Sequence, residues 1–478
     1  CVSIADGHPL GTVNIDDLNI INEDYLVTPS PSWKNLALKD KQTIFFNIAD
    51  QLEAHRDKII YFLIHEAGKT YKDAIDEIRE AVDFLRYYAV QAEKISQVRQ
   101  SLPGPTGETN DLFYEPKGVF VCISPWNFPV AIFIGQIAAA LITGNSVLAK
   151  PSEHTPLLGE IVADIFYDCG IPTDALQLFH GNGEVGQKLI SCSGINGVAF
   201  TGSLETAKKI HQQLSHKAGP IANLIAETGG LNAMIIDSSS LLEQVVDDIL
   251  RSAFNSAGQR CSALRIALIH ETIYEDLLNL LRDAMKELWV GNPEEFHCDV
   301  GPIIEDRAMT RLKNYLQQFQ DRKFPVFSHN QAPNSGCFIA PTLIELSSLD
   351  EIDHEMFGPI LHTLPFQVDN LDNMLSQLVQ KGYGLTMGMH SRIEGKVDDL
   401  LQKSITGNVY INRDIVGAVV GSQPFGGTGL SGTGFKAGGP NYLLQFVDER
   451  TVTKNTVAFG GNTDCLLYTS PSPRDATL

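Results

Sequence analysis

The sequence predicts an α/β protein built on two doubly wound parallel sheets. Continuously apolar runs at 119–123, 147–149 and 197–200 have the composition of strands that are buried on both faces. Stretches with apolar residues at helical spacing lie at 157–168 and 205–213. Because strand and helix alternate, we expect a parallel sheet covered by helices. A chain of 478 residues has room for two or three domains with their own cores.

The same alternation begins again after residue 230, so we expect a domain boundary there. The first domain is predicted at 1–230 and the second at 231–440. The second series consists of strand-like runs at 233–236 and 264–269 and helix-like stretches at 241–256 and 274–288.

The region before the first strand, 32–100, is predicted to be helical. Its stretches 41–66 and 72–95 carry apolar residues at helical spacing with charges between them. The apolar stretch 130–149 is interrupted by Gln136 and by polar residues from Thr143 to Ser146, so each part is too short to span a membrane. We expect a buried helix, a turn and a buried strand there, and no transmembrane segment.

Three short strand-like runs stand apart from both series. We expect a small β flap that pairs within itself or with another subunit, with 105–116 excluded from the first domain and 441–464 forming C-terminal oligomerisation strands. The tail 465–478 has no apolar period and two Ser-Pro steps, so we expect a disordered or foreign segment. The strand-like runs are 112–114, 443–447 and 451–457.

The composition argues against several classes of partner. A formal net charge of −21 is unsuited to nucleic acid or to an anionic membrane surface. The eight Cys form no CxxC pair and no Cys/His cluster with zinc spacing, so we expect no metal site and reduced thiols in the cytoplasm. Because the chain opens on Cys1 without Met, we expect a fragment or an excised domain.

Three residues suit acyl chemistry on a carbonyl group. Cys261 supplies a thiol, Glu227 a carboxylate that can activate water, and Asn127 an amide that can hold an oxyanion. A free thiol is mostly protonated at neutral pH, and Arg260 is one source of positive field beside it. The alternatives are a small buried hydrophobe at Cys261 and a salt-bridged structural residue at Glu227.

Three segments have features of a nucleotide site, each with a plainer alternative. Residues 181–186 fit GxGxxG, but no acidic residue ends a following strand, which favours a Gly-rich turn that opens a helix. Gly202 and Ser203 stand where a strand meets a helix, which suits either a phosphate or a simple Ser N-cap. Lys150 and Glu153 follow a strand and could bind ribose hydroxyls. Without other context, a solvated charge pair is the favoured interpretation of these two residues.

Seven motifs occur in an order that resembles the aldehyde dehydrogenase superfamily. Within it, EAGKT (66–70) with REAVDF (79–84), RCSALR (260–265) and IVGAVVG (415–421) resemble the L-glutamate γ-semialdehyde (pyrroline-5-carboxylate) dehydrogenase module of bacterial proline utilisation A. The seven motifs are PWNFP (125–129), KPSE (150–153), FTGS (200–203), ETGG (227–230), GQRC (258–261), EMFGP (355–359) and PFGG (424–427).

The resemblance implies an aldehyde dehydrogenase-like fold, with an NAD-binding domain at 1–230, a catalytic domain at 231–440 and a small β oligomerisation flap. It implies that Cys261 forms a thiohemiacetal with the aldehyde while the Asn127 side chain and the Cys261 N–H hold the oxyanion. Hydride then passes to NAD, and Glu227 activates the water that hydrolyses the Cys261 thioester.

The resemblance also implies two sets of binding residues. The Glu153 carboxylate would repel a 2′-phosphate, which favours NAD over NADP. The implied cofactor contacts are Trp126, Lys150, Glu153, Gly202, Ser203, Glu355 and Phe357. The implied substrate contacts are Phe128, Arg260, Ser262, Gly417, Ala418 and Phe425.

The expected activity is therefore NAD-dependent oxidation of L-glutamate γ-semialdehyde to L-glutamate in proline catabolism. Oxidation of another semialdehyde, or an inactive scaffold, are the alternatives. We expect a cytoplasmic homodimer that binds a small amino-acid semialdehyde, and the resemblance implies a proline dehydrogenase domain in the full-length protein.

Overall fold

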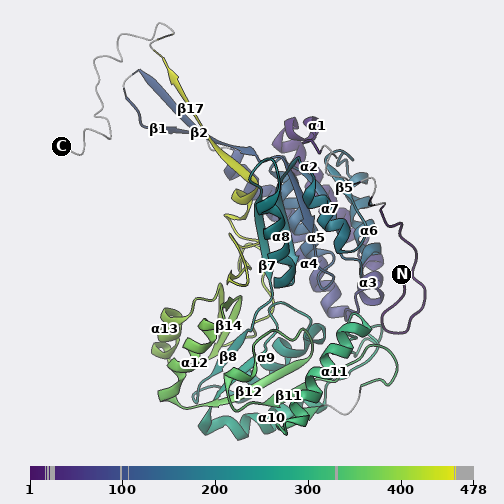
Figure 1. Cartoon of the computed structure of the whole chain (residues 1–478), viewed down its shortest axis with the longest axis vertical. Coiled ribbons are helices and arrows are strands. Elements are labelled where there is room, and N and C mark those ends of the chain that lie inside the picture. Colours follow the sequence, from purple (N-terminus) through teal and green to yellow (C-terminus); the bar gives the residue numbers. More distant parts are fainter. Residues whose placement is uncertain are drawn as a thin grey trace, which may run out of the picture.

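Two α/β bodies and a projecting flap make up the chain (Figure 1). The predicted α/β class is confirmed. The tail predicted at 465–478 lies outside the described residues. The computed structural model describes residues 1–16, 18, 21, 27–96, 99–105, 107–328, 332–456 and 458.

The first body contains a five-stranded parallel sheet in the order β5-β4-β3-β6-β7. Each predicted strand of the first series is present, and β3 and β4 are buried because their side chains are apolar and helices cover both faces. The order of strands reverses between β3 and β6, which makes the carboxyl ends of these two strands the switch point of the sheet. The strands are β3 (Val119–Ile123), β4 (Ser146–Lys150), β5 (Leu176–Leu178), β6 (Ile195–Gly202) and β7 (Asn223–Thr228).

The helices of the first body follow the predicted alternation. The stretch 130–149 is a buried helix, a turn and a buried strand, as expected. The motif at 181–186 opens helix α7 with Asn182 as the N-cap, so the interpretation as a Gly-rich turn that opens a helix holds. The helices are α5 (Ala131–Ile142), α6 (Pro156–Asp168), α7 (Gly183–Ser191) and α8 (Leu204–His216).

The helical lead-in contains four helices, and one predicted helix is divided. The stretch predicted at 41–66 breaks at His55, whose φ of −98° and ψ of 11° lie outside the helical region. A single straight helix of that length would extend about 39 Å. The break lets both halves pack against α4. The helices are α1 (Pro31–Asn35), α2 (Leu38–Ala54), α3 (Arg56–His65) and α4 (Tyr71–Ser96).

The second body contains a seven-stranded sheet in the order β10-β11-β12-β9-β8-β14-β15. The sheet is parallel as predicted except at one edge, where β10 pairs antiparallel with β11. The described residues between these two strands, 332–341, form no helix, and the chain returns in the opposite direction. The strands are β8 (Ala233–Ile236), β9 (Ile266–His270), β10 (Val326–Ser328), β11 (Thr342–Glu345), β12 (Ile360–Phe366), β14 (Thr386–His390) and β15 (Asn408–Ile411).

Helices cover this second sheet and share its apolar core. A two-stranded ribbon of β13 (Tyr383–Gly384) and β16 (Thr428–Gly429) lies beside it. Short 3-10 helices span Asn255–Gly258, Glu271–Ile273 and Leu349–Glu351. The helices are α9 (Leu242–Phe254), α10 (Tyr274–Lys286), α11 (Asp306–Asp321), α12 (Val368–Gln380) and α13 (Glu394–Lys403).

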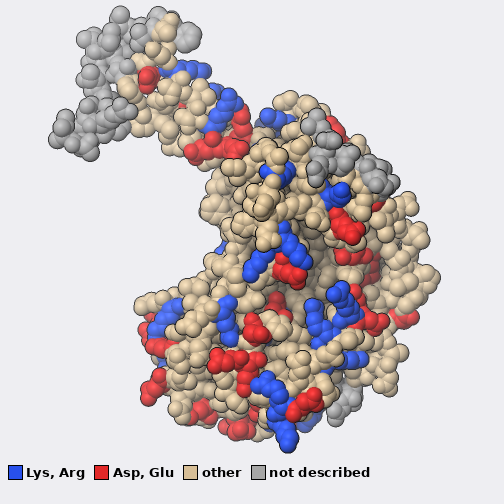
Figure 2. All heavy atoms as spheres, viewed as in Figure 1, with Lys and Arg blue, Asp and Glu red and all other residues tan. Residues whose placement is uncertain are grey.

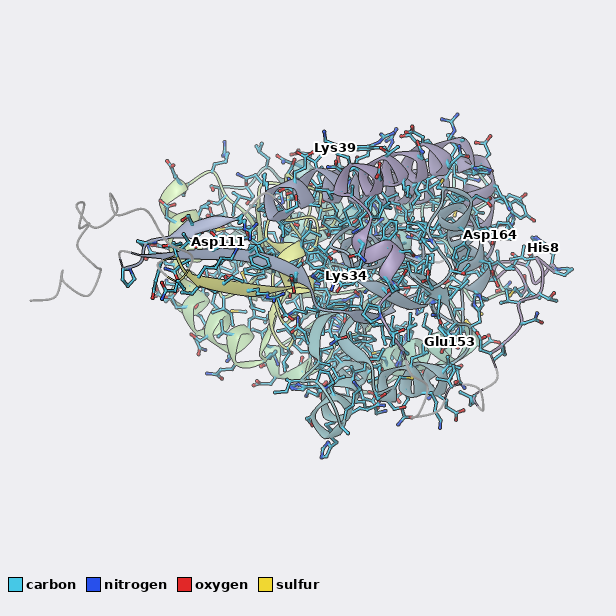
Figure 3. The ribbon with its side chains drawn as sticks, turned by 90° about the horizontal axis from the view of Figure 1, so that it is seen from above. His8, Lys34, Lys39, Asp111, Glu153 and Asp164 are labelled. Carbon is cyan, nitrogen blue, oxygen red and sulfur yellow. The ribbon has the colours of Figure 1, made fainter. Side chains whose placement is uncertain are left out.

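The flap is a three-stranded sheet in the order β1-β2-β17. β2 and β17 pair antiparallel over their whole length. The predicted alternative in which the flap strands pair within one chain therefore holds for these two strands. Figure 1 shows the flap extending away from the two bodies, and Figure 3 shows it from above, with Asp111 on β2. The strands are β1 (Gln100–Leu102), β2 (Glu108–Pro116) and β17 (Val447–Asn455).

The strand predicted at 443–447 is wrong. Tyr442–Phe446 forms a 3-10 helix, and Tyr442, Leu443 and Phe446 are buried in the core of the first body. A short apolar run does not distinguish a buried strand from a buried helical turn.

Lys and Arg are interspersed with Asp and Glu on the face shown in Figure 2. Within the described part of the chain, no helix combines the length and the apolar character that crossing a bilayer requires.

Candidate active site

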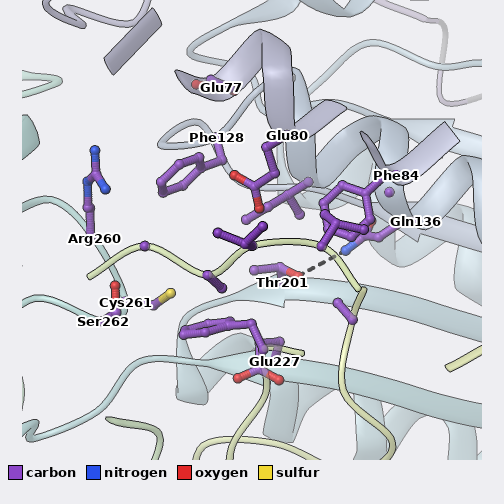
Figure 4. A pocket seen from close by; sticks show the side chains of 18 of the residues that line it. Glu77, Glu80, Phe84, Phe128, Gln136, Thr201, Glu227, Arg260, Cys261 and Ser262 are labelled. Carbon is purple, nitrogen blue, oxygen red and sulfur yellow. Dashed lines mark hydrogen bonds between the residues drawn. The ribbon is translucent and has the colours of Figure 1, made fainter. Parts of the chain in front are cut away.

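A cavity of about 430 Å³ lies between the two bodies, beside α4 and β7 (Figure 4). It brings together the thiol of Cys261 and the carboxyl group of Glu227. All six residues that the sequence suggested for substrate binding also line it. These are Phe128, Arg260, Ser262, Gly417, Ala418 and Phe425.

The turn that presents Cys261 is strained. Ser256 and Ala257 have φ of 53° and 54°, in the left-handed region that side chains with a Cβ rarely adopt. Gly258, with φ of 65°, follows them, and a Cβ there would overlap the backbone of Gly358. Such a turn persists only where its surroundings hold it in place.

Arg265 holds this turn from inside the protein. Its side chain is 1% exposed, and it donates to the carbonyl oxygens of Gly258 at 2.9 Å, Gly358 at 3.1 Å and Arg260 at 3.1 Å. It also pairs with the Glu355 carboxylate at 2.9 Å. One buried guanidinium thus links the nucleophile turn to the loop that carries Glu355.

Cys261 is a neutral thiol in this arrangement. Burial raises the pKa of the Cys261 thiol far above its usual range, and the carboxyl groups of Glu227 and Glu355 raise it further. The interpretation of Arg260 as a source of positive field for the thiol is not supported. The Arg260 guanidinium pairs with Asp73 of α4 at 2.8 Å, and Figure 4 shows it directed away from the Cys261 sulfur.

Asn127 lies in the loop after β3, close to the nucleophile turn. Its side chain is buried and donates to the carbonyl oxygen of Gln259 at 3.1 Å. This is its one hydrogen bond to the described residues, so the second N–H of the amide stays available. The position suits an oxyanion donor.

Glu227 is the penultimate residue of β7. Its two carboxyl oxygens accept from the N–H of Gly427, at 3.0 and 3.3 Å. Burial raises the pKa of Glu227 well above its usual value, although the Gly427 hydrogen bond and the Lys436 charge both lower it. A carboxyl group with a raised pKa is a better proton acceptor once ionised, which suits a general base.

Two cofactor candidates lie at the switch point of the first sheet. Trp126 follows β3, and Ser203 follows β6. The Ser203 hydroxyl accepts from the N–H of Thr206 at 3.2 Å, so it is an N-cap of α8. The remaining N–H groups at this helix start can still receive a phosphate.

The other cofactor candidates come from two further loops. Lys150 ends β4, and its ammonium lies 3.6 Å from the Glu153 carboxylate. Glu153 is labelled in Figure 3, and its side chain is 48% exposed. In the second body, the Glu355 carboxylate lies against Gly229, where a Cβ would overlap it. Phe357 makes an edge contact with Trp126, with ring centroids 5.8 Å apart.

The cofactor candidates lie outside this cavity. None of the seven residues from Trp126 to Phe357 is among those that line it. Cys261 feels the charge of Glu227, which lines the cavity, and of Glu355, which is one of the cofactor candidates. This placement suits a nucleophile that must meet both a substrate and a cofactor.

Sequence reasoning missed several charged residues around the cavity. Asp73, Glu77 and Glu80 line it from one side of α4, at a spacing that places them on one helix face. Burial, and the neighbouring Glu77, raise the pKa of Glu80 to about 7. The sequence feature that could have revealed them is a row of acidic residues on a helix face that also carries buried apolar residues.

Arg413 lines the cavity from the second body. Among the described residues, no group of His, Cys, Asp and Glu has the geometry to hold a metal ion.

Together these features suit a cofactor-dependent enzyme that acts on carbonyl compounds through a thiol. A model of the Aldehyde dehydrogenase family matches residues 27–452, and the chain belongs to that family.

The relatives of the chain include longer and similar-sized proteins. Bifunctional protein PutA of Escherichia coli (strain K12) is 45% identical over 436 residues, which cover 89% of this chain and 32% of that protein. The crystal structure of a Bradyrhizobium japonicum Proline Utilization A (PutA) mutant has a TM-score of 0.90 at 43% identity, covering 93% of this chain and 46% of that one. The 1-pyrroline-5-carboxylate dehydrogenase from Thermus with bound NAD has a TM-score of 0.83 at 31% identity, covering 89% and 83%. The chain thus spans 32% of the length of its curated PutA relative.

Proposed function

We propose that the chain oxidises L-glutamate γ-semialdehyde to L-glutamate with NAD, as a step of proline catabolism. The observation that carries this proposal is the set of polar groups beside Cys261: Arg260, Ser262 and the backbone of Gly417 and Ala418 line the same cavity. These groups suit the carboxylate and amine of an amino-acid semialdehyde, while the rings of Phe128 and Phe425 suit its aliphatic part. The names of the PutA and 1-pyrroline-5-carboxylate dehydrogenase relatives support the same substrate.

Arg260 binds the substrate carboxylate as part of a network. Its Nη2 is paired with Asp73, and its Nε donates to the hydroxyl of Ser256 at 3.0 Å. The rest of the guanidinium fork can contact a carboxylate while Asp73 keeps the side chain in position. Several polar partners permit strong discrimination against aldehydes that lack the amino-acid group.

Cys261 and Asn127 carry the first half of the reaction. The thiol proton passes to water as the sulfur forms a bond to the aldehyde carbon, and the carbonyl oxygen becomes an oxyanion. The second N–H of Asn127 and the backbone N–H of Cys261 stabilise this oxyanion. NAD accepts a hydride when it is bound, so the carbon is oxidised by two electrons and the product stays on Cys261 as a thioester.

Glu227 carries the second half. Its ionised carboxylate accepts a proton from water, and the resulting hydroxide attacks the thioester carbon. The carbon–sulfur bond breaks and glutamate leaves. The Cys261 sulfur takes the proton that Glu227 accepted from water, which restores both groups. The flanking glycines Gly426 and Gly432 leave room around the Glu227 carboxyl group, because a Cβ at either would come within 3.2 Å of it.

The residues fit NAD as the cofactor. A helix start after β6, a buried carboxylate at Glu355 and the Lys150–Glu153 pair supply donors and acceptors for a pyrophosphate and two riboses. The half-exposed carboxylate of Glu153 would repel a 2′-phosphate. The Thermus relative binds NAD.

The proposal extends to partners and location. The flap extends away from the bodies, β2 is mostly half-buried and β17 is mostly exposed, which suits packing against a second copy in a homodimer. A proline dehydrogenase domain in the full-length protein would supply the substrate, in keeping with a bifunctional relative that is three times as long. We place the protein in the cytoplasm.

A substrate panel tests the proposal. NADH formation is followed with L-glutamate γ-semialdehyde and with succinate semialdehyde, each with NAD and with NADP. We expect the highest kcat/KM for the first aldehyde with NAD, and no turnover in a Cys261→Ala variant. Equal or better turnover of succinate semialdehyde would refute the substrate, and an active Cys261→Ala variant would refute the mechanism.

A further inference from the structure

The loop that carries Asn127 continues directly into helix α5, whose start is held by another helix. The N-cap residue of α5, Val130, has no side-chain hydrogen bond to the helix start. Instead Oε1 of Glu77, on α4, accepts from the N–H groups of Val130 at 2.8 Å and Ala131 at 3.3 Å. These N–H groups lack partners within α5, and a negative charge is favoured at a helix N-terminus.

A buried lysine completes this arrangement. The Lys69 ammonium lies 2.7 Å from Oε2 of Glu77, and the two side chains are 3% and 0% exposed. The contact is an ion pair whose angles fall outside hydrogen-bond geometry. The same ammonium lies 4.0 Å from the ring centre of Phe128, a favourable position over an aromatic face.

The two charges therefore hold the Asn127 loop on its C-terminal side, within three residues of the proposed oxyanion donor. Lys69 contacts Phe128, the residue after Asn127, and Glu77 holds the backbone at Val130. Among the described residues, the side-chain amide of Asn127 makes a hydrogen bond only to Gln259, so its aim depends on where the loop is held.

We propose that Glu77, together with Lys69, is a positioning residue for the Asn127 amide. The inference rests on the proposed mechanism, in which Asn127 stabilises the oxyanion. An oxyanion donor lowers the barrier only when it is aimed at the oxygen in advance. A displacement of about 1 Å can lower a rate about 100-fold. In this inference Glu77 acts on kcat through the position of Asn127.

Glu66 provides a matched control. It is also a buried carboxyl group from the helical lead-in, and it accepts from the N–H groups of Leu157 and Leu158 at 2.9 Å each. Glu66 therefore stabilises the start of α6, whereas Glu77 stabilises the start of α5. A general effect of losing a buried helix-capping carboxylate would appear in both.

The experiment compares Glu77→Ala, Glu77→Gln and Glu66→Gln, with and without Asn127→Ala. Each kcat is measured at saturating NAD with whichever aldehyde the parent oxidises fastest, so the result does not depend on the semialdehyde being the substrate. We expect Glu77→Ala to lower kcat about 100-fold and Glu77→Gln about 10-fold, because Gln keeps an acceptor for Val130 but meets the Lys69 ammonium with an amide N–H₂. Aldehyde KM should change less than about threefold, and Glu66→Gln should keep the parent kcat.

The double variants separate positioning from general damage. In the Asn127→Ala background we expect either Glu77 substitution to lower kcat less than about threefold further, because the group it positions is gone. An equal loss with and without Asn127, or an equal loss in Glu66→Gln, would overturn the inference.

Hydrogen exchange gives a second readout that needs no turnover. Amide exchange in Glu77→Gln should rise at 126–131 and not at the start of α6. Unchanged exchange at 126–131 would also overturn the inference, whatever the kinetics show.

Discussion

At the scale of single residues, burial favours the neutral form of both reactive groups of the cavity. It raises the pKa of Cys261 and of Glu227, so the thiolate and the carboxylate are both less favoured there than in water. Each group disfavours the charge of the other, since two anions in one poorly solvated cavity repel. Cys261 and Glu227 are therefore expected to ionise in turn, one in each half of the reaction.

This predicts the pH dependence of thioester hydrolysis. Glu227 accepts a proton only when ionised, and its pKa is raised, so the rate should fall as the pH drops through that raised pKa. A Glu227→Gln variant should still form one NADH per active site in a rapid burst, while steady-state turnover falls at least ~100-fold. Stopped-flow measurement of burst and steady state across pH checks this. A variant without a burst would assign Glu227 to the first half-reaction instead.

The absence of a side chain at Gly229 leaves room for the Glu355 carboxylate, and substitution by Ala tests this. A Cβ at Gly229 would overlap the Glu355 carboxylate, which is tied to Arg265 and cannot retreat freely. Gly229→Ala should displace Glu355 and raise the Kd for NAD about tenfold, or ~1.4 kcal/mol. Calorimetric titration with NAD measures this, and Gly183→Ala is a suitable control because a Cβ there has open space around it. Unaltered NAD binding in Gly229→Ala would exclude Glu355 from the cofactor site.

The identities of the site residues were predictable from the sequence, but their partners were not. The motifs around Cys261, Glu227 and Asn127 are local in sequence, so their spacing reveals them. The pairing of Arg260 with Asp73 joins segments 187 residues apart, and no local pattern encodes it. For this reason the sequence suggested a free cation beside the thiol where the structure has an ion pair.

At the scale of elements, α4 both packs in the core of the first body and carries charged residues that contact the candidate active site. Its apolar face packs on α2 and α5, while Asp73 and Glu77 reach Arg260 and the start of α5. The helical periodicity of 72–95 predicted the helix itself correctly. It did not predict the divided helix at His55 or the 3-10 helix at Tyr442–Phe446, because both depend on what the segment packs against.

The helix-capping carboxyl group of Glu66 predicts a pH-dependent stability. Burial raises its pKa to about 7, although the hydrogen bonds from Leu157 and Leu158 lower it. The folded state therefore binds the proton more tightly than the unfolded state, so the parent should lose stability as the pH rises from about 4.5 to 7. The loss relative to Glu66→Gln should be about 3 kcal/mol at most. Urea unfolding of both proteins at pH 4.5, 6 and 7.5 measures the difference, and parallel pH profiles would show that Glu66 keeps an ordinary pKa in the folded state.

At the scale of the whole molecule, the position of the cavity explains why both bodies are needed. Cys261 and the loop from Arg413 to Phe425 come from the second body, whereas Glu227, Phe128 and α4 come from the first. The last chain segment then leaves the second body, contributes Tyr442–Phe446 to the first core and continues as β17 into the flap. The alternation of strands and helices and the order of the motifs predicted the fold class and the order of these parts. They did not predict that the C-terminal segment contacts both bodies, because that depends on packing between residues far apart in the sequence.

The flap carries the last prediction, which concerns assembly. A three-stranded sheet that projects from the body has little core of its own, so it needs a partner surface to be stable. A chain that ends at Val447 lacks β17 beyond its first residue and should sediment as a monomer, whereas the parent should sediment as a dimer. A chain that ends at Ala458 keeps all of β17 and serves as the matched control, which should remain dimeric. Sedimentation velocity at several concentrations distinguishes these cases, with NAD binding to show that the shortened chain is folded. A dimer that survives the loss of β17 would place the contact elsewhere, and a monomeric parent would refute the proposed homodimer.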